Sequence, residues 1–283
     1  MDKIKVERFS LEQTLECGQC FHFQKVEDNH YVFVVGKKAY DISQDGEILN
    51  LHNISEEEFM NELYDYFDLG TDYKYIQDYL CKKDEKLKTS VQEMSGIKIL
   101  KQEFFETLIS FIISANNHIS RIKKSVAEIS KNYGEHIDTL SGVQCYSFPN
   151  ADALIKVSAD ELRATGIGFR DKYIMDACDK YLNGVISEAY LRNCSEQEAY
   201  DHLMQIKGVG IKVASCVTLF SLSKMQAFPI DVWIKRIMQN YYFDGNETKN
   251  EDILKFAREL YSPYEGYAQQ YLFHYGRSKG NKK

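Results

Sequence analysis

A lysine follows two closely spaced glycines in the C-terminal third of the chain, and an aspartate follows the lysine. The segment Gln205–Cys216 reads QIKGVGIKVASC, and Asp231 comes nineteen residues after Lys212. Glycine is favoured where a tight turn needs a positive φ, so Gly208 and Gly210 predict a hairpin between two helices. Lys212 then lies in the first turn of the second helix, where the helix dipole disfavours a charged ammonium. The uncharged amine of a lysine is a nucleophile, so Lys212 is a candidate catalytic residue.

Each of these residues also has a simpler interpretation, which the sequence leaves open. The hairpin could bind a phosphate through the unpaired N–H groups of the helix N-terminus, or it could only pack two helices together. Lys212 could contact a phosphate instead of reacting. Cys216 shares a helix face with Lys212, and Asp231 could be an ordinary N-cap of the next helix.

The elements that position these residues change in character along the chain. Between residues 21 and 52, short runs rich in β-branched and aromatic residues alternate with turns such as Asp45-Gly46, which predicts an antiparallel sheet. After about residue 55 the apolar spacing becomes helical, and the segment Phe104–Ala115 predicts a buried central helix. The sequence therefore predicts the α+β class.

The α+β chain divides into two expected parts. We predict an N-terminal antiparallel β domain at residues 1–95 and a mainly α-helical body at residues 96–283. Within the body, the helix-hairpin-helix is expected at residues 199–223, because Ser195 and Glu198 form a capping box just before it.

Composition excludes several classes of protein. No apolar stretch reaches the roughly 20 residues that span a bilayer, and the N-terminus lacks a secretory pattern. Seven cysteines, an odd number, do not suggest a disulfide framework, so we expect a cytoplasmic protein, at the nucleoid if it is prokaryotic. Cys17 and Cys20 form one C-x-x-C pair without a second, and no metal is expected. The net charge of −7 argues against a nucleic-acid partner, but five basic residues stand against Asp231 alone in the segment 204–240.

Motif order then indicates a family. The segment 206–237 places the glycine hairpin, Lys212 and a Pro-x-Asp motif in an order that resembles the signature of the helix-hairpin-helix base-excision DNA glycosylase superfamily. Other segments resemble the 8-oxoguanine DNA glycosylase family across nearly the whole chain. They are CGQCFHF at 17–23, FIISANNHISRI at 111–122, GIGFRDKY at 166–173 and YEGYAQQYLF at 264–273.

This resemblance implies an activity and a partner. The protein would be a monomeric, bifunctional N-glycosylase and DNA lyase that acts on double-stranded DNA containing 8-oxoguanine. Lys212 would attack C1′ of a flipped nucleotide, and Asp231 would stabilise positive charge on the sugar. The backbone of Gly208, Val209 and Gly210 would grip the DNA, through a cation held by main-chain carbonyls. No other cofactor is expected, and the substrate cleft would lie between the β domain and two helical domains.

The resemblance also implies a pocket for the damaged base. Cys216 and Phe273 would sandwich the purine, Pro229 would line the same site, and Gln269 would read the Watson–Crick edge. The carbonyl of Gly18 would accept the N7 hydrogen that 8-oxoguanine has and guanine lacks.

A further set of residues would face the strand opposite the lesion. Asn116, Arg121 and Arg170 match positions that contact the orphaned cytosine. Phe169 stands in place of an intercalating tyrosine and keeps a ring that can wedge between bases. Three other departures from the family pattern fall on His22, His118 and Trp233.

Two other functions stay open on the sequence. A non-catalytic helix-hairpin-helix DNA-binding protein would bind with steep salt dependence and release no base. A glycosylase for a different oxidised base, such as another purine lesion or thymine glycol, would keep the chemistry and change the substrate.

Overall fold

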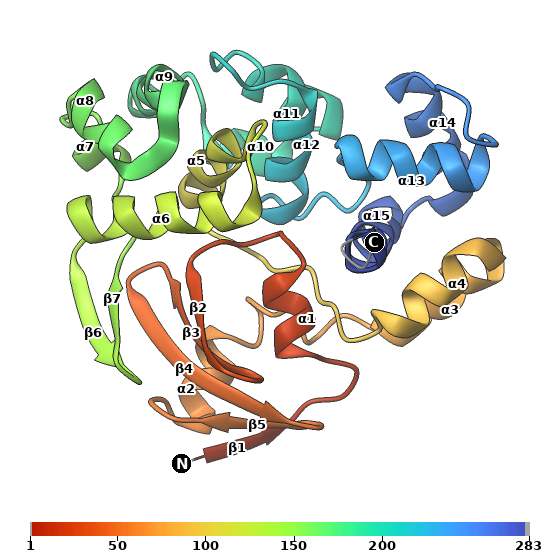
Figure 1. Cartoon of the computed structure of the whole chain (residues 1–283), viewed down its shortest axis with the longest axis horizontal. Coiled ribbons are helices and arrows are strands. Elements are labelled where there is room, and N and C mark those ends of the chain that lie inside the picture. The colour runs from red at the N-terminus through yellow and green to blue at the C-terminus, as the bar shows by residue number, and fades with distance from the viewer. Residues whose placement is uncertain (1, 281–283) are drawn as a thin grey trace.

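Antiparallel strands form a sheet in the N-terminal part of the chain, below the larger body of helices in Figure 1. The structure is a computed structural model that describes residues 2–280. The strand order is β1-β5-β4-β3-β2. The turn predicted at Asp45-Gly46 joins β4 to β5, and Gly46 has the positive φ of +55° that such a turn favours. The strands of this sheet are β1 (Asp2–Lys5), β2 (Phe23–Glu27), β3 (His30–Val35), β4 (Lys38–Asp45) and β5 (Ile48–Leu51).

Strand β3 is covered on both faces, which explains its continuous apolar run. Tyr31 and Phe33 point into the core of the N-terminal sheet. Val32 and Val34 pack instead with Cys145 of a second hairpin, made of β6 (His136–Leu140) and β7 (Val143–Tyr146). This hairpin is not evident from the sequence, because its strands are short and mostly polar on their outer face.

The rest of the described chain is mainly helical. Ser195 and Glu198 form the predicted capping box at the start of α11. The helices are α1 (Leu11–Glu16), α2 (Glu56–Glu62), α3 (Tyr73–Lys83), α4 (Glu85–Glu93), α5 (Phe104–Ser114), α6 (Ile119–Tyr133), α7 (Ala151–Leu154), α8 (Ala159–Leu162), η1 (Arg163–Ile167), η2 (Gly168–Arg170), α9 (Asp171–Leu182), α10 (Glu188–Asn193), α11 (Glu196–Leu203), α12 (Ile211–Phe220), α13 (Val232–Tyr242), α14 (Asn250–Tyr261) and α15 (Glu265–Gly280).

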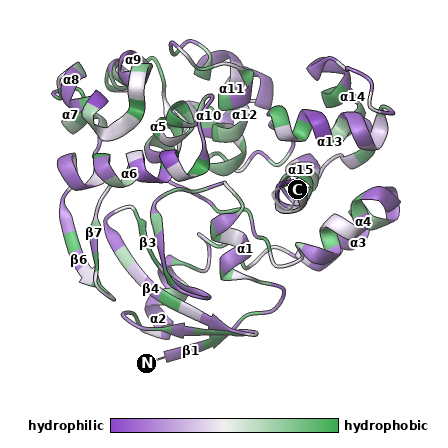
Figure 2. Ribbon diagram, in the orientation of Figure 1, coloured by the Kyte–Doolittle hydropathy of each residue, from purple (hydrophilic) through white to green (hydrophobic). Residues whose placement is uncertain are grey.

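Helix α5 forms the centre of the helical body, as its apolar spacing predicts. Every residue from Thr107 to Ser114 is buried, and the ring of Phe111 stacks on Phe220 of α12 at a centroid distance of 5.5 Å. Figure 2 shows hydrophilic residues on outer helices such as α8 and α14, with hydrophobic residues gathered toward the middle. The α+β class with an N-terminal antiparallel sheet is confirmed.

Helices α3 and α4 follow the sheet in sequence but pack with the helical core. Ile76 and Leu80 of α3 and Leu87 and Val91 of α4 belong to the same buried cluster as α5 and α12. The boundary at residue 95 stays a prediction. Within residues 2–280, no helix is both long enough and apolar enough to cross a bilayer.

Candidate active site

A cavity of about 880 Å³ opens where the loop after α1 meets α5, α6, α12, α13 and α15. It therefore lies between the N-terminal part and the helices, as the resemblance implies. The predicted site residues that line it are Gly18, Asn116, Gly208, Gly210, Lys212, Asp231 and Phe273.

Lys212 points into this cavity from the first turn of α12. Its Nζ donates to the hydroxyl of Ser114 at 3.1 Å and lies 5.3 Å from the ring centroid of Phe111. It takes part in none of the salt bridges found among residues 2–280. The amine is thus held by a neutral partner and is not tied to a carboxylate.

The two hairpin glycines have different backbone conformations. Gly208 has φ of +79°, and a Cβ there would lie 2.4 Å from the ring of Tyr173, so both the turn and the packing require glycine. Gly210 has φ of −101° and is the N-cap of α12, and a Cβ there would meet no described atom within 4 Å. The prediction that both glycines serve a positive-φ turn is therefore wrong for Gly210.

Asp231 is the N-cap of α13 and also lines the cavity. Its Oδ1 accepts hydrogen bonds from the backbone N–H groups of Trp233 at 3.0 Å and Ile234 at 2.8 Å. The simple N-cap interpretation is correct, and it fixes the carboxylate in the wall that also carries Lys212. Trp233, one of the departures from the family pattern, lines the same wall.

Phe273 and Gly18 lie against each other in the wall of the cavity. Gly18 has φ of +84°, and a Cβ there would lie 3.1 Å from Cε1 of Phe273. A side chain at position 18 would therefore press on the ring, so this turn needs glycine for both reasons.

The other predicted base-pocket residues, Cys216, Pro229 and Gln269, are buried and are not among the residues that line the cavity. Burial raises the pKa of the Cys216 thiol to about 11, so the sulfur is a neutral, polarizable surface at neutral pH. Gln269 donates from Nε2 to the carbonyl of Pro229 at 3.2 Å. Its Oε1 is buried and has no hydrogen-bond partner among residues 2–280.

Some of the residues expected to face the opposite strand have exposed side chains, whereas others are buried in contacts within the protein. Asn116 and Arg121 are exposed, and Phe169 is 57% exposed. Arg170 is buried, and its guanidinium donates to the carbonyls of Ala115, Asn116 and Ile167. In this structure Arg170 fixes the loop after α5, which differs from the expected free guanidinium. Val209 is buried, and its side chain belongs to the helical core.

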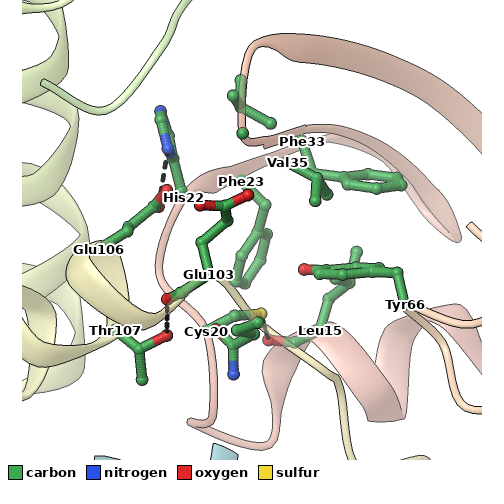
Figure 3. A pocket seen from close by; sticks show the side chains of 13 residues that line it. Leu15, Cys20, His22, Phe23, Phe33, Val35, Tyr66, Glu103, Glu106 and Thr107 are labelled. Carbon is green, nitrogen blue, oxygen red and sulfur yellow. Dashed lines mark hydrogen bonds and ion pairs between the residues drawn. The ribbon is translucent and has the colours of Figure 1, made fainter. Parts of the chain in front are cut away.

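His22, another departure, takes part in a contact beside a second, small cavity of about 20 Å³ (Figure 3). Its Nδ1 lies 2.9 Å from Oε1 of Glu106 on α5. Figure 3 also shows Cys20 at the wall of this cavity. The space holds about one water molecule and is too small for a nucleobase. The contact ties the loop after α1 to the central helix.

The described cysteines give no sign of a metal centre. All seven thiols are free, and burial raises the pKa of both Cys17 and Cys20. Within residues 2–280, one group of three potential ligands was found, formed by His30, Asp41 and His52. Asp41 already bonds His30 and Ser141 at 2.6 Å each, so its carboxylate is satisfied without an ion.

Sequence reasoning missed several polar residues that line the large cavity, and three of them make contacts that bear on the site. Ser114 holds Lys212 and lies within the apolar run of α5. Lys123 lies with its Nζ 3.6 Å from the ring centroid of Phe23. Arg277 lies one helical turn after Phe273, and that spacing was the available signal for it.

Comparisons with known proteins match both parts of the chain. A family model described as HhH-GPD superfamily base excision DNA repair protein matches residues 109–263, and one described as the N-terminal domain of 8-oxoguanine DNA glycosylase matches residues 3–108. An N-glycosylase/DNA lyase of Saccharomyces cerevisiae is 31% identical, over 89% of this chain and 72% of its own length.

Solved structures are similar over almost the whole chain. The Clostridium acetobutylicum 8-oxoguanine glycosylase/lyase, solved with double-stranded DNA containing cytosine opposite 8-oxoG, is 38% identical with a TM-score of 0.92, over 97% of this chain and 94% of that one. MBOgg1, solved in complex with a low affinity DNA ligand, is 39% identical with a TM-score of 0.93, over 98% of this chain and 96% of that one.

A helix-hairpin-helix fold that holds a lysine and an aspartate in one cavity defines a base-excision glycosylase. The chain belongs to the HhH-GPD superfamily of base excision DNA repair proteins and, within it, to the 8-oxoguanine DNA glycosylase family. It is a bifunctional DNA N-glycosylase and abasic-site lyase, and the non-catalytic alternative is not supported.

Proposed function

We propose that this protein excises 8-oxoguanine from duplex DNA with Lys212 as the nucleophile and then cleaves the abasic strand. The observation that carries the proposal is the Lys212 amine, which lines a cavity large enough to admit a nucleoside and bonds the Ser114 hydroxyl rather than a carboxylate. A base inside a duplex cannot reach this amine, so the nucleotide must flip out at a cost of a few kcal/mol.

The proposed reaction has two stages, release of the base and cleavage of the strand. The uncharged amine of Lys212 forms a bond to C1′, and the N-glycosidic bond breaks with its electron pair leaving on N9 of the base, which takes up a proton. Opening of the sugar ring gives a Schiff base between Lys212 and C1′. Loss of a proton from C2′ then expels the 3′ phosphate, which cleaves the strand by β-elimination.

Asp231 has the position to support the first stage. Because its Oδ1 is fixed by two backbone N–H groups, the carboxylate keeps its orientation in the cavity wall. A fixed negative charge there would stabilise the positive charge that develops on the sugar as the base leaves.

The base pocket is proposed at the end of the cavity nearest α15. Phe273 would stack on one face of the purine and Cys216 on the other, with Pro229 and Gln269 behind them. The buried, unpaired Oε1 of Gln269 supports this assignment, since the N–H groups of a guanine Watson–Crick edge would satisfy it. The carbonyl of Gly18 would accept the N7 hydrogen of the lesion.

Contacts to the rest of the duplex would come from two turns. Phe169 is exposed at a turn that begins with Gly166 and Gly168 and would wedge into the base stack, with Asn116 and Arg121 beside the orphaned base. Arg170 would act there mainly by holding the carbonyl of Asn116.

The hairpin Gly208–Gly210 would hold the DNA backbone through a cation. The main-chain carbonyls of Lys207, Gly208 and Val209 accept no hydrogen bond from any described residue, so they fit the oxygen ligands that a hard cation prefers. When bound, such an ion would supply positive charge that attracts a phosphate. We infer that the protein works as a monomer. We also infer that it is located in the cytoplasm, at the nucleoid if it is prokaryotic, and its seven free thiols support a reducing compartment.

Release of free base from defined duplexes tests the proposal. Single-turnover assays with 8-oxoguanine opposite each of the four bases should show release, with strand cleavage at the resulting site. Duplexes containing thymine glycol serve as the comparison lesion. Faster release of thymine glycol than of 8-oxoguanine would reject the proposed substrate.

A further inference from the structure

Helix α15 carries three side chains at a spacing of four residues, and the proposed function uses only two of them. Gln269, Phe273 and Arg277 therefore share one face of the helix. Phe273 and Arg277 both line the cavity. We infer that Arg277 is a specificity-determining residue that donates a hydrogen bond to the C8 carbonyl oxygen of 8-oxoguanine. This inference rests on the proposed function.

The guanidinium of Arg277 is fixed at one nitrogen and unpaired at another. Nη2 donates to the carbonyl of Glu16, and Cζ lies 5.6 Å from the ring centroid of Phe273. Nη1 is buried but has no hydrogen-bond acceptor among residues 2–280. An arginine stays charged in proteins, and a buried charged donor without an acceptor is costly. A ligand in the site could therefore supply the hydrogen-bond acceptor that Nη1 of Arg277 lacks.

The unpaired nitrogen lies beside the residue proposed to recognise the lesion. A Cβ on Gly18 would be 3.4 Å from Nη1 of Arg277. In 8-oxoguanine, the N7–H donor and the C8 carbonyl acceptor are adjacent on one edge of the ring. The Gly18 carbonyl and the Arg277 N–H offer the complementary pair, an acceptor next to a donor. Guanine has neither the N7 hydrogen nor the C8 oxygen, so it would leave both protein groups unpaired.

At the other end of the same face of α15, Gln269 offers a hydrogen-bond acceptor where Arg277 offers a donor. The buried Oε1 of Gln269 is an acceptor without a partner among the described residues, whereas Nη1 of Arg277 is a donor without one. Eight residues of helix span about 12 Å, and the two long side chains can converge on a purine that lies on Phe273 between them. The Watson–Crick edge and the C8 edge are at opposite ends of a purine, so one base satisfies both groups.

The experiment compares a duplex that contains 8-oxoguanine with a duplex in which the damaged base is already absent. Single-turnover rates are measured for release of 8-oxoguanine opposite cytosine and for strand cleavage at a preformed abasic site. Arg277→Met removes the donors and keeps an unbranched side chain. We expect base release to fall about 10- to 100-fold more than abasic-site cleavage, the range of one charged hydrogen bond. Arg277→Lys should also fail, because one nitrogen cannot bond both the Glu16 carbonyl and the base.

Lys123→Met is the matched control, because it removes a different positive charge from the wall of the same cavity. It should change the two rates by similar factors. Circular dichroism and the unfolding midpoint establish that each variant is folded.

Three results would overturn the inference. One is no change in base release for Arg277→Met, and another is an equal fall in both rates. The third is a weaker salt dependence of binding to undamaged duplex, which would make Arg277 a phosphate contact. Failure of the unmodified protein to release 8-oxoguanine would instead reject the proposed function, and with it this inference.

Discussion

Two turns in the helical body share one sequence pattern and hold their cations differently. Gly208 to Lys212 and Gly166 to Arg170 both read Gly-x-Gly-x-cation. Both cations reach the C-terminal end of α5. Lys212 has one hydrogen bond there and lines the cavity, whereas Arg170 makes four hydrogen bonds to three backbone carbonyls and is 6% exposed.

The difference in hydrogen bonding matches the proposed roles, a reactive lysine and a structural arginine. A lysine held by one hydrogen bond to a hydroxyl can turn toward a substrate with the loss of that bond alone. A guanidinium bonded to several buried carbonyls cannot leave without exposing them unpaired. We propose that the same local pattern serves chemistry in one turn and positions a loop in the other, because the tertiary contacts differ.

Gly208→Ala should have the largest effect on stability. It combines a positive φ with a methyl group 2.4 Å from the ring of Tyr173. We expect the free energy of unfolding to fall by about 2 to 5 kcal/mol, measured by urea denaturation.

Gly210→Ala is the matched control for that substitution. Its φ is negative and the space around it is open, so the loss should stay below about 1 kcal/mol. Similar losses for the two variants would show that the backbone of the hairpin is assigned wrongly.

Arg170→Met should have the next largest effect. It removes the donors that satisfy the carbonyls of Ala115 and Ile167 and should cost about 2 to 4 kcal/mol in urea denaturation. Lys212→Met, by contrast, should change stability by less than about 1 kcal/mol. If Arg170→Met were no more destabilising than Lys212→Met, the contrast between the turns would fail.

Phe169→Ala should leave stability nearly unchanged and weaken DNA binding. Because the ring is 57% exposed, we expect a change in unfolding free energy of about 0.5 kcal/mol or less. Loss of a ring that stacks between bases should lower affinity for lesion duplex about tenfold in fluorescence anisotropy. Unchanged affinity would remove Phe169 from the DNA interface.

The sequence predicts the fold well where the periodicity of apolar residues is strong. The strands between residues 21 and 52 and the helix at Phe104–Ala115 follow from spacing and are confirmed. The β6–β7 hairpin could not be predicted, because its burial comes from contact with β3, which is distant in sequence.

The hydrogen-bond partners and positions of polar side chains were the least predictable feature of the site. The resemblance to the glycosylase signature placed Lys212 and Asp231 in one motif. It could not indicate that Arg170 would turn inward to backbone carbonyls or that Arg277 would enter the cavity, because both outcomes depend on how α5, α6 and α15 meet.

Borohydride trapping tests the central claim most directly, since it reports a covalent bond between the protein and C1′. Incubation with an 8-oxoguanine duplex and borohydride should give a stable protein–DNA complex, and peptide mapping should locate the linkage on Lys212. Lys212→Gln should give no complex while keeping the unfolding midpoint of the parent. Trapping by Lys212→Gln at the parental level, or a linkage mapped to Lys123, would contradict the account.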